Sequence, residues 1–501
     1  MSIAPNDYEE SSLASVDYYL SVVAHKIQML NMRVEKISQQ DYTSPSPIAL
    51  SEILVRILAR FFDTLKLLSR KADYQTPEDI IRTARTINFA VEGIIPQLLE
   101  AIESANKDTP ITSVIEAYEN IVSQVRYGAK AIMYPKWEYN ASFDEIMNIL
   151  RRMTKSLDTQ LNKAIFSGAP PFFAIITYPK AEESAILRQA LMAHEIGHFI
   201  SVALGWSDSI FENQLFSPDD YDNIIDFVAA QEIKDQKRIA LDVVLLVEEA
   251  IVPWIQEIIS DFLAVCALGP AYLIAFDEVI FLPDFPGDQK IYRSHPPEAL
   301  RKHLMGNLIK DLYLDPILYT PIHEDLSEAE QNLFTNVYHW VNIISKNPDE
   351  EQFKTIQDLD NIPPDVIRLA YRIMRKSVEQ ALFIMRRDYY PEIKEEAWVC
   401  KLGDILDSLK LQELLAHGLT PTELYTTPAR DPNFAAIMNS GWFYLIQNAE
   451  RYLYFSKNKS MAINPDIVRA DYINLQNLIA KSIESLMFKK EFNRRRGTID
   501  G

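Results

Sequence analysis

Residues 191–206 read LMAHEIGHFISVALGW and contain an HExxH motif, which decides how the rest of the chain is interpreted. The stretch predicts a helix, on which residues four apart lie on the same face. His194 and His198 can therefore direct two imidazoles at one metal ion. Glu195 lies about 100° round the helix axis from His194, so it can act beside the ion as a general base toward water. Gly197 adds little bulk and suits the close approach of another element.

A catalytic zinc site needs a third protein ligand, and its identity separates the classes of metallopeptidase. One class extends the motif with Gly at position 201 and a third His at position 204. This chain has Ser201 and Leu204 there, which excludes that class. The remaining possibility is a carboxylate from a second helix.

The stretch 251–270, IVPWIQEIISDFLAVCALGP, supplies such a carboxylate in an otherwise apolar setting. Glu257 and Asp261 are four residues apart, and two acids on one face of a buried helix are costly unless they are paired or bound to metal. We predict that Glu257 ligates zinc and that Asp261 accepts the free ring N–H of a ligand histidine. Glu248 and Glu249 are rival ligands, but neither is followed by an acid four residues on.

An HEIGH motif followed by ExxxD resembles the gluzincin metallopeptidases. Residues 294–301, SHPPEALR, add a His-Pro element with Arg six residues after the His. This element resembles the branch that contains the CAAX prenyl proteases and the heat-shock membrane protease HtpX. The resemblance covers residues 172–301 and implies that His295 hydrogen-bonds the oxyanion or bound peptide, while Arg301 helps to orient it. Those relatives are membrane-embedded, so their substrates are not inherited.

The flanking sequence predicts a mainly α fold with a small α+β zincin-type catalytic core and helical domains on both sides. The predicted domains are residues 1–165, 166–310 and 311–501. In the first, apolar residues recur at helical spacing. They are Leu50, Ile53, Leu54, Ile57, Leu58, Phe61, Leu65 and Leu68.

Several shorter segments carry their own predictions. Residues 142–145, SFDE, form a capping-box pattern that predicts a helix start. Residues 172–178, FFAIITY, predict a strand, interpreted as an edge strand that pairs with substrate beside the site. Residues 206–240 carry eight Asp and Glu against three Lys and Arg and predict loop with weak helix. Breaks are predicted near Pro253 and at Gly269-Pro270.

Composition limits the partners. The net charge of −20 and the pI near 4.9 disfavour nucleic acid and acidic membranes. The apolar, uncharged run at residues 262–276 is too short to span a bilayer and reads as buried core, so no membrane insertion is predicted. Only Cys266 and Cys400 occur, which favours a reducing compartment, and cytoplasmic localisation is the expectation.

Together these patterns predict a soluble zinc metalloendopeptidase acting on a protein or peptide. The large helical flanks favour one dedicated regulatory substrate. In this hypothesis His194, His198 and Glu257 hold zinc, and Glu195 activates the water that attacks the peptide carbonyl. The alternative is a helical interaction protein whose zinc site is vestigial or structural. The presence of Glu195 favours the enzyme, because a structural site has no use for a general base.

Overall fold

The computed structural model describes residues 5–42, 44–70, 76–105, 111–136, 142–145, 149–151, 169–211, 217–231, 235–279, 289–357, 359, 362–424, 431–448 and 465–499. Of these described residues, 77% are in helices and 6% in strands, so the predicted mainly α class is confirmed. The chain divides into two compact units, Met1–Glu183 and Ser184–Gly501. The three-domain division remains a prediction.

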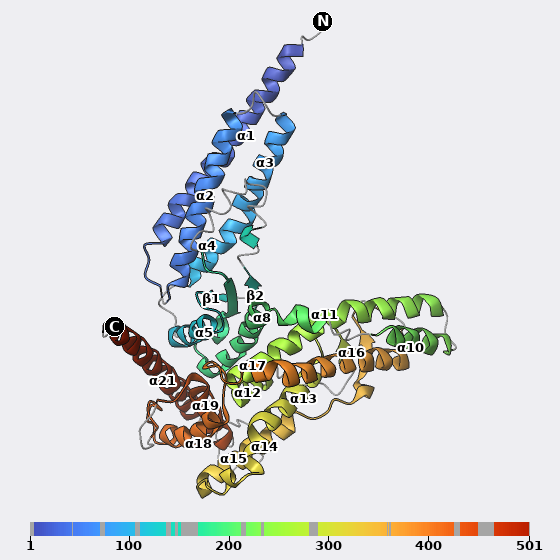
Figure 1. The fold of residues 1–501 in the computed structure, drawn as a ribbon, viewed down its shortest axis with the longest axis vertical. Helices are drawn as coiled ribbons and strands as arrows, with labels where there is room; N and C mark the ends of the chain where they lie inside the picture. Colours follow the sequence, from blue (N-terminus) through green and yellow to red (C-terminus); the bar gives the residue numbers. More distant parts are fainter. Residues whose placement is uncertain are drawn as a thin grey trace. The chain divides into compact units, whose positions relative to one another are not determined.

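The first unit is built on long helices, of which α1, α2 and α3 run alongside one another (Figure 1). All eight apolar residues of the predicted helical stripe are buried in α2. The helices are α1 (Pro5–Ile37), α2 (Ser46–Arg70), α3 (Pro77–Phe89), α4 (Ile95–Ser104) and α5 (Thr112–Val125), with a π-helical turn, η1 (Ala90–Ile94), between α3 and α4.

A three-stranded sheet completes the first unit, in the order β1 (Lys130–Lys136), β3 (Phe173–Pro179), β2 (Ser142–Glu145). The strand predicted at 172–178 is confirmed as β3. Its interpretation as an edge strand is wrong, because β3 pairs in parallel with β1 and antiparallel with β2. Both of its main-chain edges are therefore occupied, and β3 cannot add a substrate strand.

The predicted helix start at 142–145 is also wrong, because these residues form β2. Pairing with the centre of a sheet satisfies main-chain groups that a local capping pattern would otherwise serve. Since β3 belongs to the first unit and the HEIGH motif to the second, the zincin-type core assigned to 166–310 remains a prediction.

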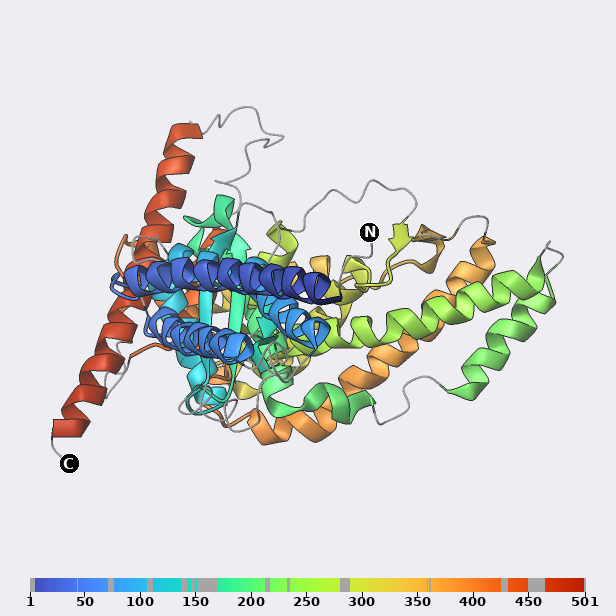
Figure 2. The same ribbon diagram turned by 90° about the horizontal axis from the view of Figure 1, so that it is seen from above.

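The second unit surrounds one long helix, α11 (Gln236–Leu268). The motif helix α8 (Met192–Leu204), together with α10 (Pro218–Ala229), α13 (Glu298–Ile309) and α16 (Pro364–Ile384), packs against it. Figure 2 shows α16 lying along α11. The other helices are α9 (Trp206–Phe211), α12 (Pro270–Val279), α14 (Asp315–Leu318), α15 (Glu328–Ile344), α17 (Tyr390–Ile393), α18 (Leu402–Ala416), α19 (Phe434–Gln447) and α21 (Pro465–Ile499), with π-helical turns η4 (Lys310–Leu314) and η7 (Met385–Tyr389).

Helix α11 runs straight through Pro253, so the break predicted there is wrong. Ala250 and Trp254, on either side of the proline, are fully buried. Packing at these positions offsets the one main-chain hydrogen bond that proline removes. The predicted break at Gly269 is confirmed: Gly269 has φ +60° and caps α11 before α12 begins at Pro270.

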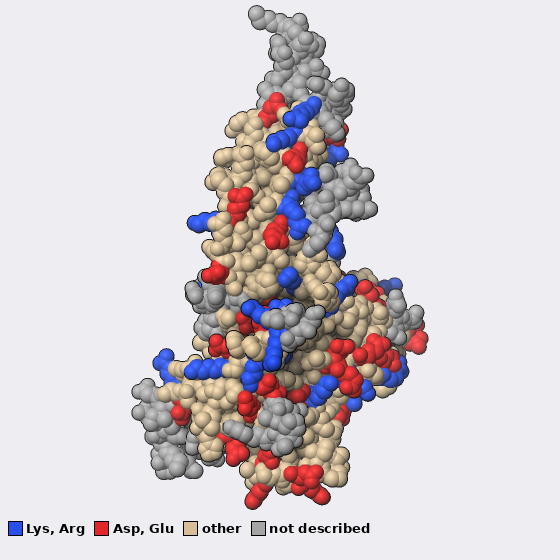
Figure 3. All heavy atoms as spheres, turned by 60° about the vertical axis from the view of Figure 1, so that its left-hand side comes forward, with Lys and Arg blue, Asp and Glu red and all other residues tan. Residues whose placement is uncertain are grey.

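Among the described helices, α11 alone is long and apolar enough to cross a membrane, but 83% of its apolar window is buried inside the protein. A core helix fits the same description. Residues 262–276 are buried throughout, as predicted for that uncharged run. On the face drawn in Figure 3, acidic and basic side chains are interspersed.

The acidic segment 206–240 is more helical than predicted. Its described part contains α9 and α10, and the N-terminus of α10 is capped by Asp220, which accepts a hydrogen bond from the Ser217 backbone N–H at 3.1 Å. Asp220 also pairs with Lys376 of α16 at 3.2 Å. The charged residues that suggest loop thus cap and anchor a helix.

A short parallel strand pair positions the segment that carries His295. Strand β4 (Gln289–Ile291) pairs with β5 (Phe353–Ile356). One residue beyond β4, the carbonyl of Tyr292 accepts a hydrogen bond from the indole N–H of Trp254 at 2.9 Å. The segment leading to His295 is therefore fixed to α11 at Trp254, about one helical turn before Glu257.

Candidate metal centre

The site forms where α8 and α11 approach closely, and Gly197 makes this approach possible. A Cβ atom at position 197 would lie 2.5 Å from the Ser260 carbonyl oxygen and 2.9 Å from its Cα. Both are backbone atoms, which cannot rotate away. The expectation that Gly197 admits a neighbouring element is confirmed, and that element is the helix carrying Glu257.

Three side chains converge at this contact: His194 and His198 of α8 and Glu257 of α11. The Nε2 atoms of the two histidines are 3.2 Å apart. The Glu257 Oε2 lies 3.2 Å from Nε2 of His194, and its Oε1 lies 3.4 Å from Nε2 of His198. Ligands about 2.0–2.1 Å from a tetrahedral zinc are about 3.3 Å apart. One ligand atom from each of the three residues lies within 4.8 Å of the others, so the group could hold a metal ion.

The cluster is recessed but reachable from solvent. The side chains of His194 and Glu257 are 12% and 11% exposed, and that of His198 is 23% exposed. Burial opposes the charged form of His194, yet the nearby carboxylates of Glu257 and Asp261 outweigh it and raise its pKa to about 10. This pocket of negative charge holds a proton on His194, and a bound cation would take the place of that proton.

Asp261 lies directly behind His194, where the sequence places it. Its Oδ1 is 2.9 Å from Nδ1 of His194. Burial alone would raise the pKa of Asp261, but the adjacent Arg301 guanidinium holds it well below its usual range. An ionised Asp261 accepts the Nδ1–H of His194, so the proton that a bound cation would displace is the one on Nε2, which faces the cluster. This hydrogen bond selects the tautomer that can bind metal.

Glu195 is buried on α8, with 8% of its surface exposed. It does not belong to the three-residue cluster. A general base must lie near the metal-bound water without being a ligand itself. Glu195 meets the second condition, and its position next to His194 on α8 keeps it near the cluster. The rivals are elsewhere, because Glu248 is exposed and accepts a hydrogen bond from Tyr221, and exposed Glu249 pairs with Arg293.

His295 and Arg301 both reach the cluster, but in different ways. The His295 side chain is 58% exposed, with Nε2 3.8 Å from Oε1 of Glu257 and Nδ1 2.7 Å from the Ser294 hydroxyl oxygen. Arg301 is 7% exposed and binds Asp261 and Glu257. Its guanidinium contacts the candidate ligand Glu257 and the carboxylate of Asp261 behind His194. The family resemblance instead implies contact with substrate.

Sequence patterns did not predict Tyr272 or Phe276, which complete the surroundings of Asp261. The hydroxyl of Tyr272 donates to Asp261 Oδ1 at 2.6 Å. The Arg301 guanidinium carbon lies 4.8 Å from the centre of the Phe276 ring. Both aromatic residues belong to α12, beyond the helix break at Gly269, and helical spacing from Asp261 cannot be extended across such a break.

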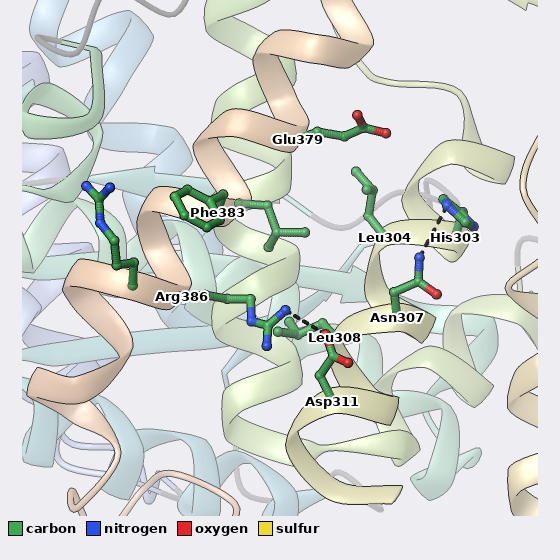
Figure 4. A pocket seen from close by; sticks show the side chains of 10 residues that line it. His303, Leu304, Asn307, Leu308, Asp311, Glu379, Phe383 and Arg386 are labelled. Carbon is green, nitrogen blue, oxygen red and sulfur yellow. Dashed lines mark hydrogen bonds and ion pairs between the residues drawn. The ribbon is translucent and has the colours of Figure 1, made fainter. Parts of the chain in front are cut away.

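A separate hollow of about 510 Å³ lies between α13 and α16 (Figure 4). His303 and Asn307 line one wall, and Phe383 lines the other. Asp311 and Arg386 pair across it at 2.6 Å. The hollow contains none of the three cluster residues, so it is distinct from the candidate metal centre.

No protein-family model, no curated protein and no solved structure matches this chain.

Proposed function

We propose that the chain is a zinc-dependent metallopeptidase of gluzincin type. The observation that carries this proposal is the convergence of His194, His198 and Glu257, each of which offers one ligand atom within 4.8 Å of the other two. A fourth coordination position is left for water and substrate, as in catalytic zinc sites with three protein ligands.

The donor set favours zinc over other common cations. Calcium and magnesium prefer all-oxygen coordination, whereas two imidazoles and one carboxylate are a frequent zinc set. The His194–Asp261 hydrogen bond supports the same proposal, because ligand histidines are commonly oriented by a carboxylate on the other ring nitrogen.

Glu195 is the proposed general base of the site. A bound zinc would polarise the peptide carbonyl and lower the pKa of the attacking water to about 7. Glu195 takes the proton from that water and later returns it to the leaving nitrogen.

His295 is assigned to the substrate side of the site. Its exposed ring is 3.8 Å from Glu257 and is carried on a segment fixed to α11, so it is available to donate to the oxyanion or to a bound peptide. The substrate is proposed to be a protein or peptide, without a role for nucleic acid or membrane insertion. Cytoplasmic localisation remains a prediction from composition.

A second candidate is a helical interaction protein with a structural or vestigial site. One observation favours it: the cluster residues already form ion pairs with one another and with Arg301, so their charges have partners even without a cation. The two candidates differ in what they require of Glu195.

The test is the Glu195→Gln variant, assayed on a library of peptides digested from a proteome. We expect retained zinc and stability but a loss of about 10²–10⁴-fold in hydrolysis, because proton transfer is removed. Glu249→Gln makes the same chemical change at an exposed position on α11 and should leave hydrolysis unchanged. Equal hydrolysis by wild type and Glu195→Gln, or none by the zinc-loaded wild type, would favour the interaction protein.

A further inference from the structure

The carboxylate of Asp261 is bound on every side. Arg301 donates from Nε to Oδ2 at 2.8 Å and from Nη2 to Oδ1 at 2.7 Å. Tyr272 donates its hydroxyl to Oδ1 at 2.6 Å, and His194 approaches the same oxygen at 2.9 Å. The fork geometry of Arg301 fixes the plane of the carboxylate, and Tyr272 fixes the direction in which Oδ1 points.

Arg301 also reaches one of the metal ligands directly. Its Nη1 lies 3.1 Å from Oε2 of Glu257, the oxygen that faces His194. One guanidinium therefore contacts a ligand, Glu257, and the partner of a second ligand, Asp261. The two acids sit one turn apart on α11, which matches the spread of a planar fork.

These contacts form a buried cluster, called the clamp from here on, in which Arg301 and Tyr272 hold the carboxylates beside His194. The clamp joins four helices. The side chains of Arg301 and Asp261 are 9% and 2% exposed, and Tyr272 is fully buried. Arg301 comes from α13, the acids from α11, Tyr272 from α12 and His194 from α8. Water does not compete for hydrogen bonds in such a buried setting, so each donor strongly restricts the orientation of the carboxylate.

We propose that Arg301 and Tyr272 are positioning residues that preset the metal ligands, with Arg301 holding Glu257 and Asp261 and both residues aiming Asp261 at His194. The inference rests on the proposed metal site and deepens it. Arg301 then acts through the ligands rather than on the substrate, a different role from that implied by the family resemblance.

The test measures zinc affinity by competition with a chromophoric chelator, using the purified full-length protein and no peptide substrate. Tyr272→Phe should weaken zinc binding by about 10-fold, and Arg301→Gln by about 10–100-fold, the range found for partners of metal ligands. Arg301→Lys should not restore affinity, because an ammonium cannot hold both oxygens in a fork.

Two matched controls separate positioning from general damage. Tyr313→Phe removes another buried tyrosine hydroxyl that binds α11, through the Val265 carbonyl at 3.1 Å, but has no contact with the cluster. Arg386→Gln breaks an Arg–Asp pair outside the site. Both controls should bind zinc like the wild type, and the unfolding of metal-free Tyr272→Phe and Tyr313→Phe should be similar.

A double-mutant cycle then tests whether Tyr272 acts through Asp261. In an Asp261→Asn background, Tyr272→Phe should cost much less affinity than in the wild type, because its acceptor has already been altered. Unchanged zinc affinity in Tyr272→Phe, or fully additive losses of affinity in the double variant, would overturn the proposed positioning role. Clamp-dependent zinc binding without peptide hydrolysis would instead overturn only the peptidase proposal, and a wild type that binds no zinc would overturn both.

Discussion

Helix α13 contributes to two charged regions that look alike in sequence and differ in structure. Arg301 faces the metal centre, with a side chain that is 9% exposed and bound to two carboxylates. Asp311, just beyond the end of α13, faces the hollow of Figure 4 and pairs with Arg386, whose side chain is 43% exposed. Arg301 thus joins two carboxylates in a buried cluster, whereas Asp311 and Arg386 form a solvent-exposed ion pair.

This difference in burial indicates which charged residues should be sensitive to substitution. An exposed ion pair contributes little and can be exchanged for water, so its loss changes little. A buried group of charges is maintained only if each member is paired, and removal of one leaves the others uncompensated. We therefore expect substitutions at the metal centre to have large, specific effects and those at the hollow to have almost none.

The largest effect should follow from His198→Ala. Two remaining ligands are too few for a stable zinc site, so stoichiometric zinc should be lost. Metal analysis of the purified variant measures this directly, with His303→Ala as the control because His303 lines the hollow. Wild-type zinc content in His198→Ala would refute the assignment of this ligand.

Asp261→Asn should have the next largest effect. An amide is a poorer partner for Nδ1–H of His194, so zinc affinity should fall by about 10–100-fold while the protein stays folded. Competition titration against a chelator gives the ratio. Affinity equal to that of the wild type would mean that Asp261 serves packing alone.

Gly197→Ala should destabilise the crossing of α8 and α11. The added Cβ meets backbone atoms of Ser260, and overpacking of this kind costs about 1–3 kcal/mol. Gly403→Ala is the matched control, since a Cβ there meets nothing within 4 Å and a helical Gly-to-Ala change is neutral or stabilising. Denaturant unfolding should show a loss only for position 197, and equal stabilities of the two variants would contradict the close approach.

Arg386→Gln should have the smallest effect. Its pair with Asp311 is solvent-exposed, so we expect a change in unfolding free energy within about 0.5 kcal/mol and no change in zinc affinity. A marked fall in zinc affinity would show that the two sides of α13 are coupled, which the contrast drawn above does not allow.

Helical spacing was a reliable guide wherever one helix carries the information. It brought His194 and His198 together on α8 and put Glu257 and Asp261 on one face of α11. Its success has a physical basis, because residues four apart must share a face whatever the tertiary structure. Gly197 was predicted on a different ground, its small size, to allow the close approach of another element, and this is confirmed.

Features that depend on distant partners were missed. Residues 142–145 carry a local helix signal that pairing with β3 overrides, and Pro253 sits inside a helix that packing keeps intact. Tyr272 reaches Asp261 across a helix break, and no spacing rule extends over a change of helix direction. The role of Arg301 depended on tertiary contacts that its distance from the HEIGH motif does not reveal.

The most direct test of the central claim is the metal content and coordination of the wild-type protein, measured by elemental analysis together with X-ray absorption at the zinc edge. We expect about one zinc per chain, bound by two imidazole nitrogens and one carboxylate at about 2.0–2.2 Å, with a further oxygen from water. A protein that remains free of metal when supplied with zinc, or a zinc without imidazole ligands, would contradict it.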